Sequence, residues 1–185
     1  MVIYVGEISY KNRGMFLENI INESNTYYNS IDKCLIYKKP TPIKVLNVTY
    51  PNNRSHLIDK AVYSSISTLD YNGIYRGKYI EFDAKECHSK TSFPLSNLKE
   101  HQFDHIKKVI KQQGIAFLII MMNNEFYLLK GEDIIEFVNS NERKSIDYEY
   151  LISKGYKIKE SYTPRLKYLD AVDDAYFKEN YENEN

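Results

Sequence analysis

Two aspartates and a lysine stand close together in the middle of the chain. Asp70 is followed by twelve residues and then by Asp83-Ala84-Lys85. A pair of carboxylates suits a hard divalent cation such as Mg²⁺, which takes oxygen ligands and keeps several waters. A lysine beside them places a fixed positive charge next to a phosphate under attack. These residue types at this spacing predict metal-assisted hydrolysis of a phosphodiester.

Two of these residues lie in a segment that is predicted to be a strand. Polar and apolar side chains alternate from Tyr79 to Lys85, which is the period of a half-buried strand. Asp83 and Lys85 therefore point to the same face. Glu81 shares that face, and the pattern alone equally allows a solvated glutamate there.

A two-residue turn at Arg76-Gly77 would bring the two aspartates together, because glycine supplies the positive φ that such turns need. In that register Asp70 stands opposite Asp83, and opposed residues have Cβ atoms roughly 4.5–5.5 Å apart. Carboxylates that close repel each other unless a cation lies between them. Asn72-Gly73 is a stronger hairpin signal, and a turn there would break this register, so both alternatives stay open.

The remaining elements predict an α/β domain. We expect helices near residues 15–28, 57–65, 97–113, 132–139, 148–152 and 168–177. Ser96 is the expected N-cap of the third helix, and Gly114 closes it. Strands are expected at 34–37, 43–48, 115–122 and 125–129. The run 115–122 is apolar almost throughout, as in a strand that is buried on both faces.

Composition restricts the class of protein. The 185 residues suit one domain, which we place at 1–177. Because no run of eighteen apolar residues and no signal-peptide pattern occurs, we expect a soluble cytoplasmic protein without a membrane partner. Cys34 and Cys87 are too few for a disulfide framework. His101 and His105 share a predicted helix face, but no further cluster of ligands supports a zinc site.

The charge is unevenly distributed along the chain. The formal net charge is zero, which argues weakly against a nucleic-acid-binding protein. The last sixteen residues, however, carry six carboxylates against one lysine, a net charge of −5, so the rest carries +5. A basic body with an acidic tail is compatible with phosphate binding. We expect the end of this tail, 178–185, to be disordered.

Several motifs, taken together, resemble the RecU family of Holliday junction resolvases. The spacing of Asp70, Asp83 and Lys85 is similar to the PD-(D/E)xK nuclease motif, which is loose when it stands alone. The resemblance extends from about Asn12 to Phe177. The motifs that carry it are Asn12-Arg13-Gly14-Met15 with Leu17-Glu18, Lys38-Lys39-Pro40-Thr41-Pro42, Asp70-Tyr71-Asn72-Gly73-Ile74-Tyr75, Ala84-Lys85-Glu86 and Lys90-Thr91-Ser92-Phe93-Pro94-Leu95.

The resemblance implies a fold and an activity. The expected fold is restriction-endonuclease-like, with a central mixed β-sheet flanked by helices and a protruding stalk at about residues 50–66 that enters the junction. The expected activity is symmetric, Mg²⁺-dependent cleavage of four-way DNA junctions by a homodimer in recombination and repair. Mn²⁺ is a candidate substitute for Mg²⁺. A recombinase or a branch-migration helicase is the expected class of protein partner.

The resemblance also assigns residues to the site. Thr68 and Gln102 would complete the magnesium site with Asp70 and Asp83, and both are neutral oxygen donors. Lys85 would stabilise the phosphorus centre under attack. The predicted contacts to DNA come from six basic residues, which are Arg13, Lys38, Lys39, Arg54, Lys60 and Lys90.

Two departures from the family pattern keep alternatives open. Asp83 stands where a glutamate is usual, and the stretch before Asn12 is short and not basic. One alternative is therefore a non-cleaving protein that binds and anneals junctions in recombination. Another is an unrelated metal-dependent nuclease that has no preference for branched DNA.

Overall fold

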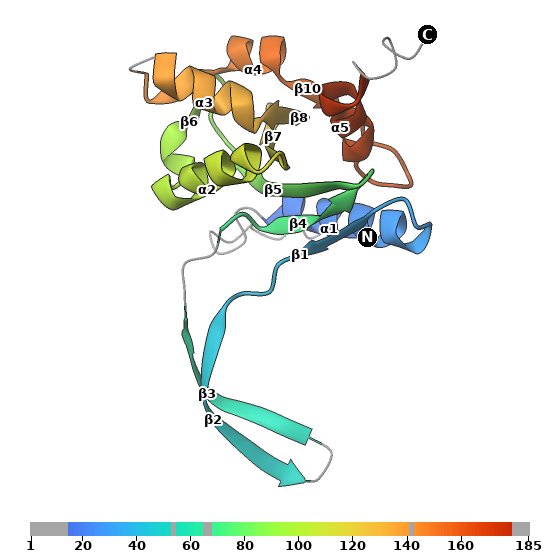
Figure 1. The fold of residues 1–185 in the computed structure, drawn as a ribbon, viewed down its shortest axis with the longest axis vertical. Helices are drawn as coiled ribbons and strands as arrows, with labels where there is room; N and C mark the ends of the chain where they lie inside the picture. The colour runs from blue at the N-terminus through green and yellow to red at the C-terminus, as the bar shows by residue number, and fades with distance from the viewer. Residues whose placement is uncertain (1–14, 53–54, 65–67, 141–142, 179–185) are drawn as a thin grey trace, which may run out of the picture.

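The computed structural model describes residues 15–52, 55–64, 68–140 and 143–178. They form the predicted α/β arrangement, in which a mixed six-stranded sheet is flanked by helices (Figure 1). The strands β5 and β7 pair in parallel, and every other neighbouring pair is antiparallel. In spatial order the strands are β1 (Leu35–Lys38), β4 (Tyr71–Tyr75), β5 (Lys78–Cys87), β7 (Ile115–Met122), β8 (Glu125–Lys130) and β10 (Tyr156–Ile158).

Helices cover both faces of this sheet. The first face packs against α1 (Met15–Ser30) and α5 (Tyr168–Tyr176). The second face packs against α2 (Glu100–Lys111), α3 (Gly131–Ser140) and α4 (Tyr148–Lys154). None of the helices in the described part of the chain is long and apolar enough to cross a membrane.

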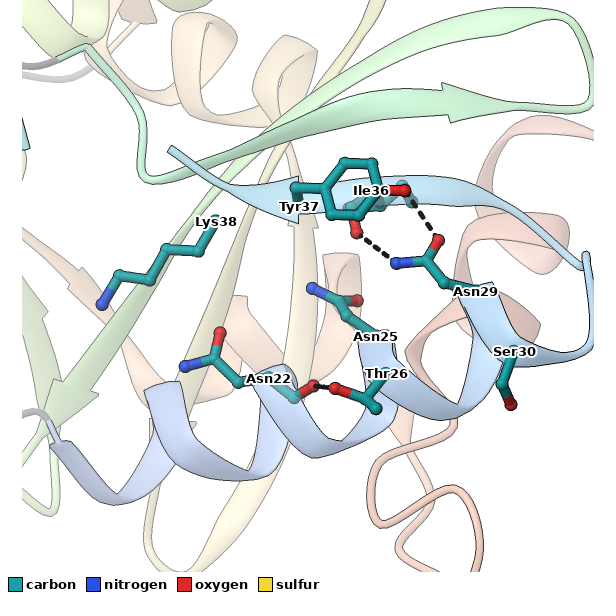
Figure 2. A pocket seen from close by; sticks show the side chains of 8 residues that line it. All are labelled: Asn22, Asn25, Thr26, Asn29, Ser30, Ile36, Tyr37 and Lys38. Atoms are coloured by element: carbon teal, nitrogen blue, oxygen red, sulfur yellow. Dashed lines mark hydrogen bonds between the residues drawn. The ribbon is translucent and has the colours of Figure 1, made fainter. Parts of the chain in front are cut away.

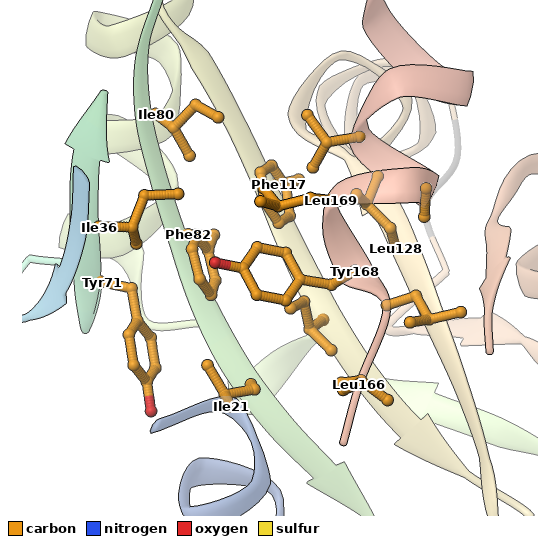
Figure 3. Close-up of a cluster of buried hydrophobic side chains, with 14 of the residues drawn as sticks. Ile21, Ile36, Tyr71, Ile80, Phe82, Phe117, Leu128, Leu166, Tyr168 and Leu169 are labelled. Carbon is orange, nitrogen blue, oxygen red and sulfur yellow. The ribbon is translucent and has the colours of Figure 1, made fainter. Parts of the chain in front are cut away.

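The prediction that residues 115–122 are buried on both faces is confirmed. Side chains of β7 alternate, so that Phe117 and Ile119 join the core under α1 and α5, while Leu118 and Ile120 join the core under α2 and α3. Figure 3 shows the first of these cores. There the Phe82 ring stacks on Phe117 at 4.8 Å between centroids, which fixes β5 against β7.

The hairpin of β4 and β5 turns at Arg76-Gly77, as one of the two alternatives predicted. Both residues have positive φ, 48° and 74°, and Tyr75 pairs with Lys78. Asn72-Gly73 lies inside β4 instead. A Cβ on Gly73 would stand 1.9 Å from the carbonyl oxygen of Leu35, so glycine is needed there for the close approach of β1.

A second hairpin, formed by β2 (Ile43–Asn52) and β3 (Ser55–Tyr63), extends away from the sheet (Figure 1). The predicted helix at 57–65 is therefore wrong, because β3 pairs along its length with β2. Cross-strand pairing is a non-local interaction that the local apolar spacing did not reveal. The hairpin also begins well before residue 50, the expected start of the stalk.

The start of α2 differs from the prediction. The predicted N-cap, Ser96, lies in a short 3₁₀ turn (Leu95–Asn97), and α2 begins at Glu100. The Gln102 side chain accepts a hydrogen bond from the Lys99 backbone N–H at 3.2 Å, and this bond caps the N-terminus of the helix. Three short strands were not predicted: β10, and the pair β6 (Ser92–Pro94) and β9 (Ser145–Asp147).

Candidate active site

Strand β5 and helix α2 bring the predicted catalytic residues together. Asp83 and Lys85 share the face of β5 that α2 covers, and Lys85 Nζ lies 3.0 Å from Asp83 Oδ2. Gln102, in the first turn of α2, donates from Nε2 to Asp83 Oδ2 at 2.6 Å. The contact between Lys85 and Asp83 confirms that the two side chains share a face, as predicted.

The segment before β4 completes the group. The register of β4 against β5 ends with Tyr71 opposite Phe82, and Asp70 is the next residue outward. Asp70 is close enough to Asp83 for its charge to act on that carboxyl, in line with the predicted proximity of the two aspartates. The Thr68 carbonyl accepts a hydrogen bond from Gln102 Nε2 at 3.2 Å, which ties this segment to α2. The structure thus gathers Thr68, Asp70, Asp83, Lys85 and Gln102 from three separate parts of the chain.

Asp83 is fully buried, with 0% of its surface exposed. Burial raises the pKa of its carboxyl to about 7; the ammonium of Lys85 opposes the rise, and the neighbouring charge of Asp70 adds to it. Within the described part of the chain, Asp83 Oδ1 has no hydrogen-bond partner. A buried carboxylate oxygen without a donor, facing a second carboxylate, fits a bound divalent cation.

The amide of Gln102 is turned with its NH₂ group toward Asp83. Its oxygen, Oε1, accepts from the Lys99 N–H and lies 3.5 Å from Lys85 Nζ. A bond from Gln102 to a cation would use this oxygen, so the contact with Lys99 would have to be given up or shared. In this arrangement Gln102 orients Asp83.

Sequence reasoning did not identify a buried cluster around Glu81 beside these residues. Glu81 is 1% exposed, which corrects the reading of a solvated residue. Its Oε2 accepts from the Tyr79 hydroxyl at 2.6 Å and lies 2.8 Å from His105 Nε2. Its Oε1 accepts from Lys39 Nζ and, at 3.2 Å, from Thr68 Oγ1. We call Glu81, Lys39, Thr68, Tyr79 and His105 the Glu81 cluster.

These contacts determine the charge of Glu81. Burial alone would raise its pKa, but the hydrogen bonds from Lys39, Tyr79 and His105 outweigh burial and hold the pKa below its ordinary value. The sequence carried two signals for the cluster. Glu81 shares the strand face of Asp83 and Lys85, and His105 lies three residues after Gln102, on the same face of α2.

The predicted DNA-binding lysines occupy different surroundings. Lys39 points inward to Glu81 and Thr68, whereas Lys38 is exposed and pairs with Glu18. Lys60 is exposed on β3 and Lys90 is exposed beyond β5. Arg13 and Arg54 lie outside the described residues, as does the tail from residue 179.

A cavity of about 510 Å³ lies between α1 and β1, away from the two aspartates. Figure 2 shows the side chains of Asn22, Asn25 and Asn29 along its wall. Asn29 donates to the carbonyl of Ile36 and accepts from its N–H, so it fastens α1 to the edge strand. Of the predicted site residues, Lys38 alone is among those that line this cavity.

Comparisons with known proteins agree with the motifs. The sequence model of the family described as "RecU: Recombination protein U" matches residues 12–174. The chain is 48% identical over 169 residues to a Holliday junction resolvase RecU of Pediococcus pentosaceus, covering 89% of this chain and 84% of that protein. It is 44% identical over 172 residues to the proteins of the same name from Bacillus licheniformis and Bacillus subtilis, covering 91% of this chain and 87% and 84% of theirs. With its aspartates, lysine and glutamine gathered at one site, the chain belongs to the RecU family.

Proposed function

We propose that this chain is a Mg²⁺-dependent endonuclease that resolves four-way DNA junctions by cutting two strands symmetrically, in recombination and repair. The observation that carries the proposal is Asp83, a buried carboxylate beside Asp70 and Lys85 that leaves one oxygen without a hydrogen-bond partner among the described residues. The names of the relatives, Holliday junction resolvase RecU, supply the class of substrate.

Each residue would have a separate task. Asp70 and Asp83 would hold Mg²⁺, with Thr68 and Gln102 as neutral oxygen donors. Bound Mg²⁺ would offset the charge at the scissile phosphate and supply an activated water. Lys85, with its side chain 18% exposed, would place its ammonium near the phosphorus, where negative charge develops. Mn²⁺ takes similar oxygen ligands and is expected to substitute.

The fold and the surface support a role on DNA. We propose that the β4–β5 hairpin, continued by the parallel pair β5–β7, is the core of a restriction-endonuclease-like fold within a single domain. The β2–β3 hairpin is the proposed stalk, and Lys38, Lys60 and Lys90 are exposed enough to contact phosphates. Arg13 and Arg54, outside the described residues, stay predicted contacts. We place the activity in the cytoplasm, with a recombinase or branch-migration helicase as a protein partner.

We further propose a homodimer, because a junction presents two symmetry-related strands and a two-fold dimer presents two sites. The β2–β3 hairpin supports an intermolecular contact. Leu57, Val62 and Tyr63 on β3 are 55%, 45% and 81% exposed, and a two-stranded ribbon of this kind is weak without a partner surface. Light scattering at working concentration tests this. A monomeric mass with full cleavage activity would contradict it.

The activity is tested on a labelled mobile four-way junction, with and without Mg²⁺, beside a linear duplex of the same sequence. We expect paired, symmetric nicks in the junction alone, and a loss of about 10²–10³-fold in rate for Lys85→Ala. Lys157→Ala, which removes a surface lysine paired with Glu125, is the matched control and should cut normally. Tight junction binding without nicks in Mg²⁺ or Mn²⁺ would favour the non-cleaving alternative, and equal cutting of the duplex would contradict junction selectivity.

A further inference from the structure

The two connections between the β2–β3 hairpin and the sheet meet next to β5, the strand that carries Asp83 and Lys85; we call β5 the catalytic strand. The first connection leaves β1 at Lys39, and the second returns through Thr68 and Asp70. The Lys39 backbone N–H donates to the Asp70 carbonyl at 2.7 Å, and Lys39 Nζ donates to Thr68 Oγ1 at 2.7 Å. Nearer the hairpin, the Ser64 N–H donates to the Pro42 carbonyl at 3.0 Å.

The segment with Thr68 and Asp70 lies outside any helix or strand. Regular backbone pairing therefore does not fix the two metal ligands proposed there. Their position depends on the contacts with Lys39, on the hydrogen bond from Gln102 and on the buried side chain of Leu69. Ligands on such a segment hold their geometry only if neighbouring groups orient them.

Glu81 is the one residue of the Glu81 cluster that contacts all the others. It accepts from Lys39 and Thr68 on the side of the connections, and it meets Tyr79 from its own strand and His105 from α2. It sits two residues before Asp83 on the same face of β5. The carboxylate of Glu81 therefore links the two hairpin connections, the catalytic strand and α2.

We propose that Glu81 is a positioning residue that clamps both hairpin connections to the catalytic strand and so fixes the segment that carries Thr68 and Asp70. This inference rests on the proposed function for the identity of the metal ligands. Glu81 itself has its oxygens occupied by four side chains and touches neither metal nor DNA in this role. The clamp would also pass a displacement of the β2–β3 hairpin to the metal site, because Lys39 and Thr68 belong to the two connections that join the hairpin to the sheet.

The clamp itself is tested without metal, by amide hydrogen exchange in the full chain. The Lys39 amide reports the hydrogen bond to the Asp70 carbonyl. In Glu81→Gln we expect the exchange of this amide to accelerate by about tenfold or more. Glu125→Gln is a matched control, because Glu125 also lies on a strand and also accepts from a lysine and from tyrosines, Lys157, Tyr127 and Tyr148, but far along the chain from the site. It should leave the Lys39 amide unchanged.

The consequence for the site is tested by titration with Mn²⁺ alone, with free Mn²⁺ followed by electron paramagnetic resonance. Changes in residues that orient metal ligands commonly weaken binding by about 10–100-fold. We expect a loss in this range for Glu81→Gln and none for Glu125→Gln. Wild-type Mn²⁺ affinity in a folded Glu81→Gln protein would overturn the inference.

A double variant separates positioning from simple stability. Glu81→Gln leaves the partly buried Lys39 beside a neutral partner, which can impair folding, whereas Glu81→Gln with Lys39→Met removes both charges. We expect the double variant to regain thermal stability but to keep weak Mn²⁺ binding. If it regains Mn²⁺ affinity as well, Glu81 has only a structural role. If the wild-type protein binds no Mn²⁺, the proposed metal site fails, while exchange at Lys39 still decides whether the clamp exists.

Discussion

Glu81 and Asp83 lie two positions apart on the same face of the same strand, and both are almost completely buried. Their surroundings differ in the number of donors. Four side chains donate to or contact the carboxylate of Glu81, and its pKa is lowered despite burial. One oxygen of Asp83 has no hydrogen-bond partner in the described part of the chain, and its pKa is raised to about 7. The described side chains satisfy both oxygens of the first carboxylate, and the second is the one that we propose binds a cation.

The largest expected effect is on folding, from Glu81→Gln. This change leaves the partly buried Lys39 without its anion. Breaking a buried ion pair typically costs about 3–5 kcal/mol, and because the Lys39 side chain is 22% exposed we expect a loss near or below the lower end of that range. Chemical denaturation at neutral pH measures the free energy of unfolding. A loss below about 1 kcal/mol would show that Glu81 is less essential to its surroundings than the contacts indicate.

Asp83→Asn should increase the free energy of unfolding of the metal-free protein, whereas Glu81→Gln decreases it. Because the folded-state pKa of Asp83 is raised, charging it disfavours the folded state; the penalty is absent below about pH 4, grows as the pH rises to about 7 and is complete above. The amide oxygen of an asparagine can still accept from Gln102. We therefore expect Asp83→Asn to stabilise the protein at pH 8 by more than about 1 kcal/mol, since one pKa unit corresponds to about 1.4 kcal/mol.

Thermal denaturation in a chelator at pH 4 and pH 8 measures this effect. The two proteins should have similar stability at pH 4 and differ at pH 8. Destabilisation by Asp83→Asn at both pH values would mean that the charged carboxylate is satisfied within the protein. The proposed difference between Asp83 and Glu81 would then be wrong.

A smaller effect is expected for Tyr79→Phe. It removes one of the four contacts of Glu81, the hydroxyl hydrogen bond at 2.6 Å, and leaves Lys39, Thr68 and His105 in place. Since Tyr79 is 42% exposed, water can replace part of what is lost, and we expect a cost of about 1 kcal/mol in unfolding free energy. Mn²⁺ affinity should stay at the wild-type value, and a loss as large as that of Glu81→Gln would contradict the shared role of the four contacts.

The smallest effect is expected for Glu125→Gln. Glu125 has partners similar to those of Glu81, and Lys157 and the two tyrosines hold its pKa at about 2. Its ion pair with Lys157 lies at the surface, however, with the Glu125 side chain 34% exposed, and exposed ion pairs are screened. We expect no measurable change in unfolding free energy or in cleavage. A large decrease in unfolding free energy would mean that the number of contacts to a carboxylate affects stability more than its burial does.

Much of the site follows from local sequence pattern. The alternation from Tyr79 to Lys85 predicted the common face of Asp83 and Lys85. Of the two turns that the sequence allowed, the one at Arg76-Gly77 gives the observed register, which brings Asp70 next to the pair Tyr71–Phe82. Both features depend on residues close together in the chain. Thr68 and Gln102 came from the family resemblance, because no periodicity links them to the strand.

The parts that sequence pattern did not predict depend on distant contacts. Glu81 is buried because Lys39 and His105, 42 and 24 residues away, converge on it, and neither spacing is visible in a strand pattern. Strand β3 was mistaken for a helix because its identity depends on pairing with β2. The start of α2 shifted from Asn97 to Glu100 because the preceding turn pairs with other parts of the chain, through β6 and β9.

The most direct test of the contrast between the two carboxylates is to soak crystals of the protein in Mn²⁺ and to compute an anomalous difference map. We expect one peak within bonding distance of Asp83 Oδ1 and the Asp70 carboxylate. We expect no peak at Glu81, whose oxygens are already occupied. A peak at Glu81 and His105, or none near Asp83 at saturating Mn²⁺, would contradict it.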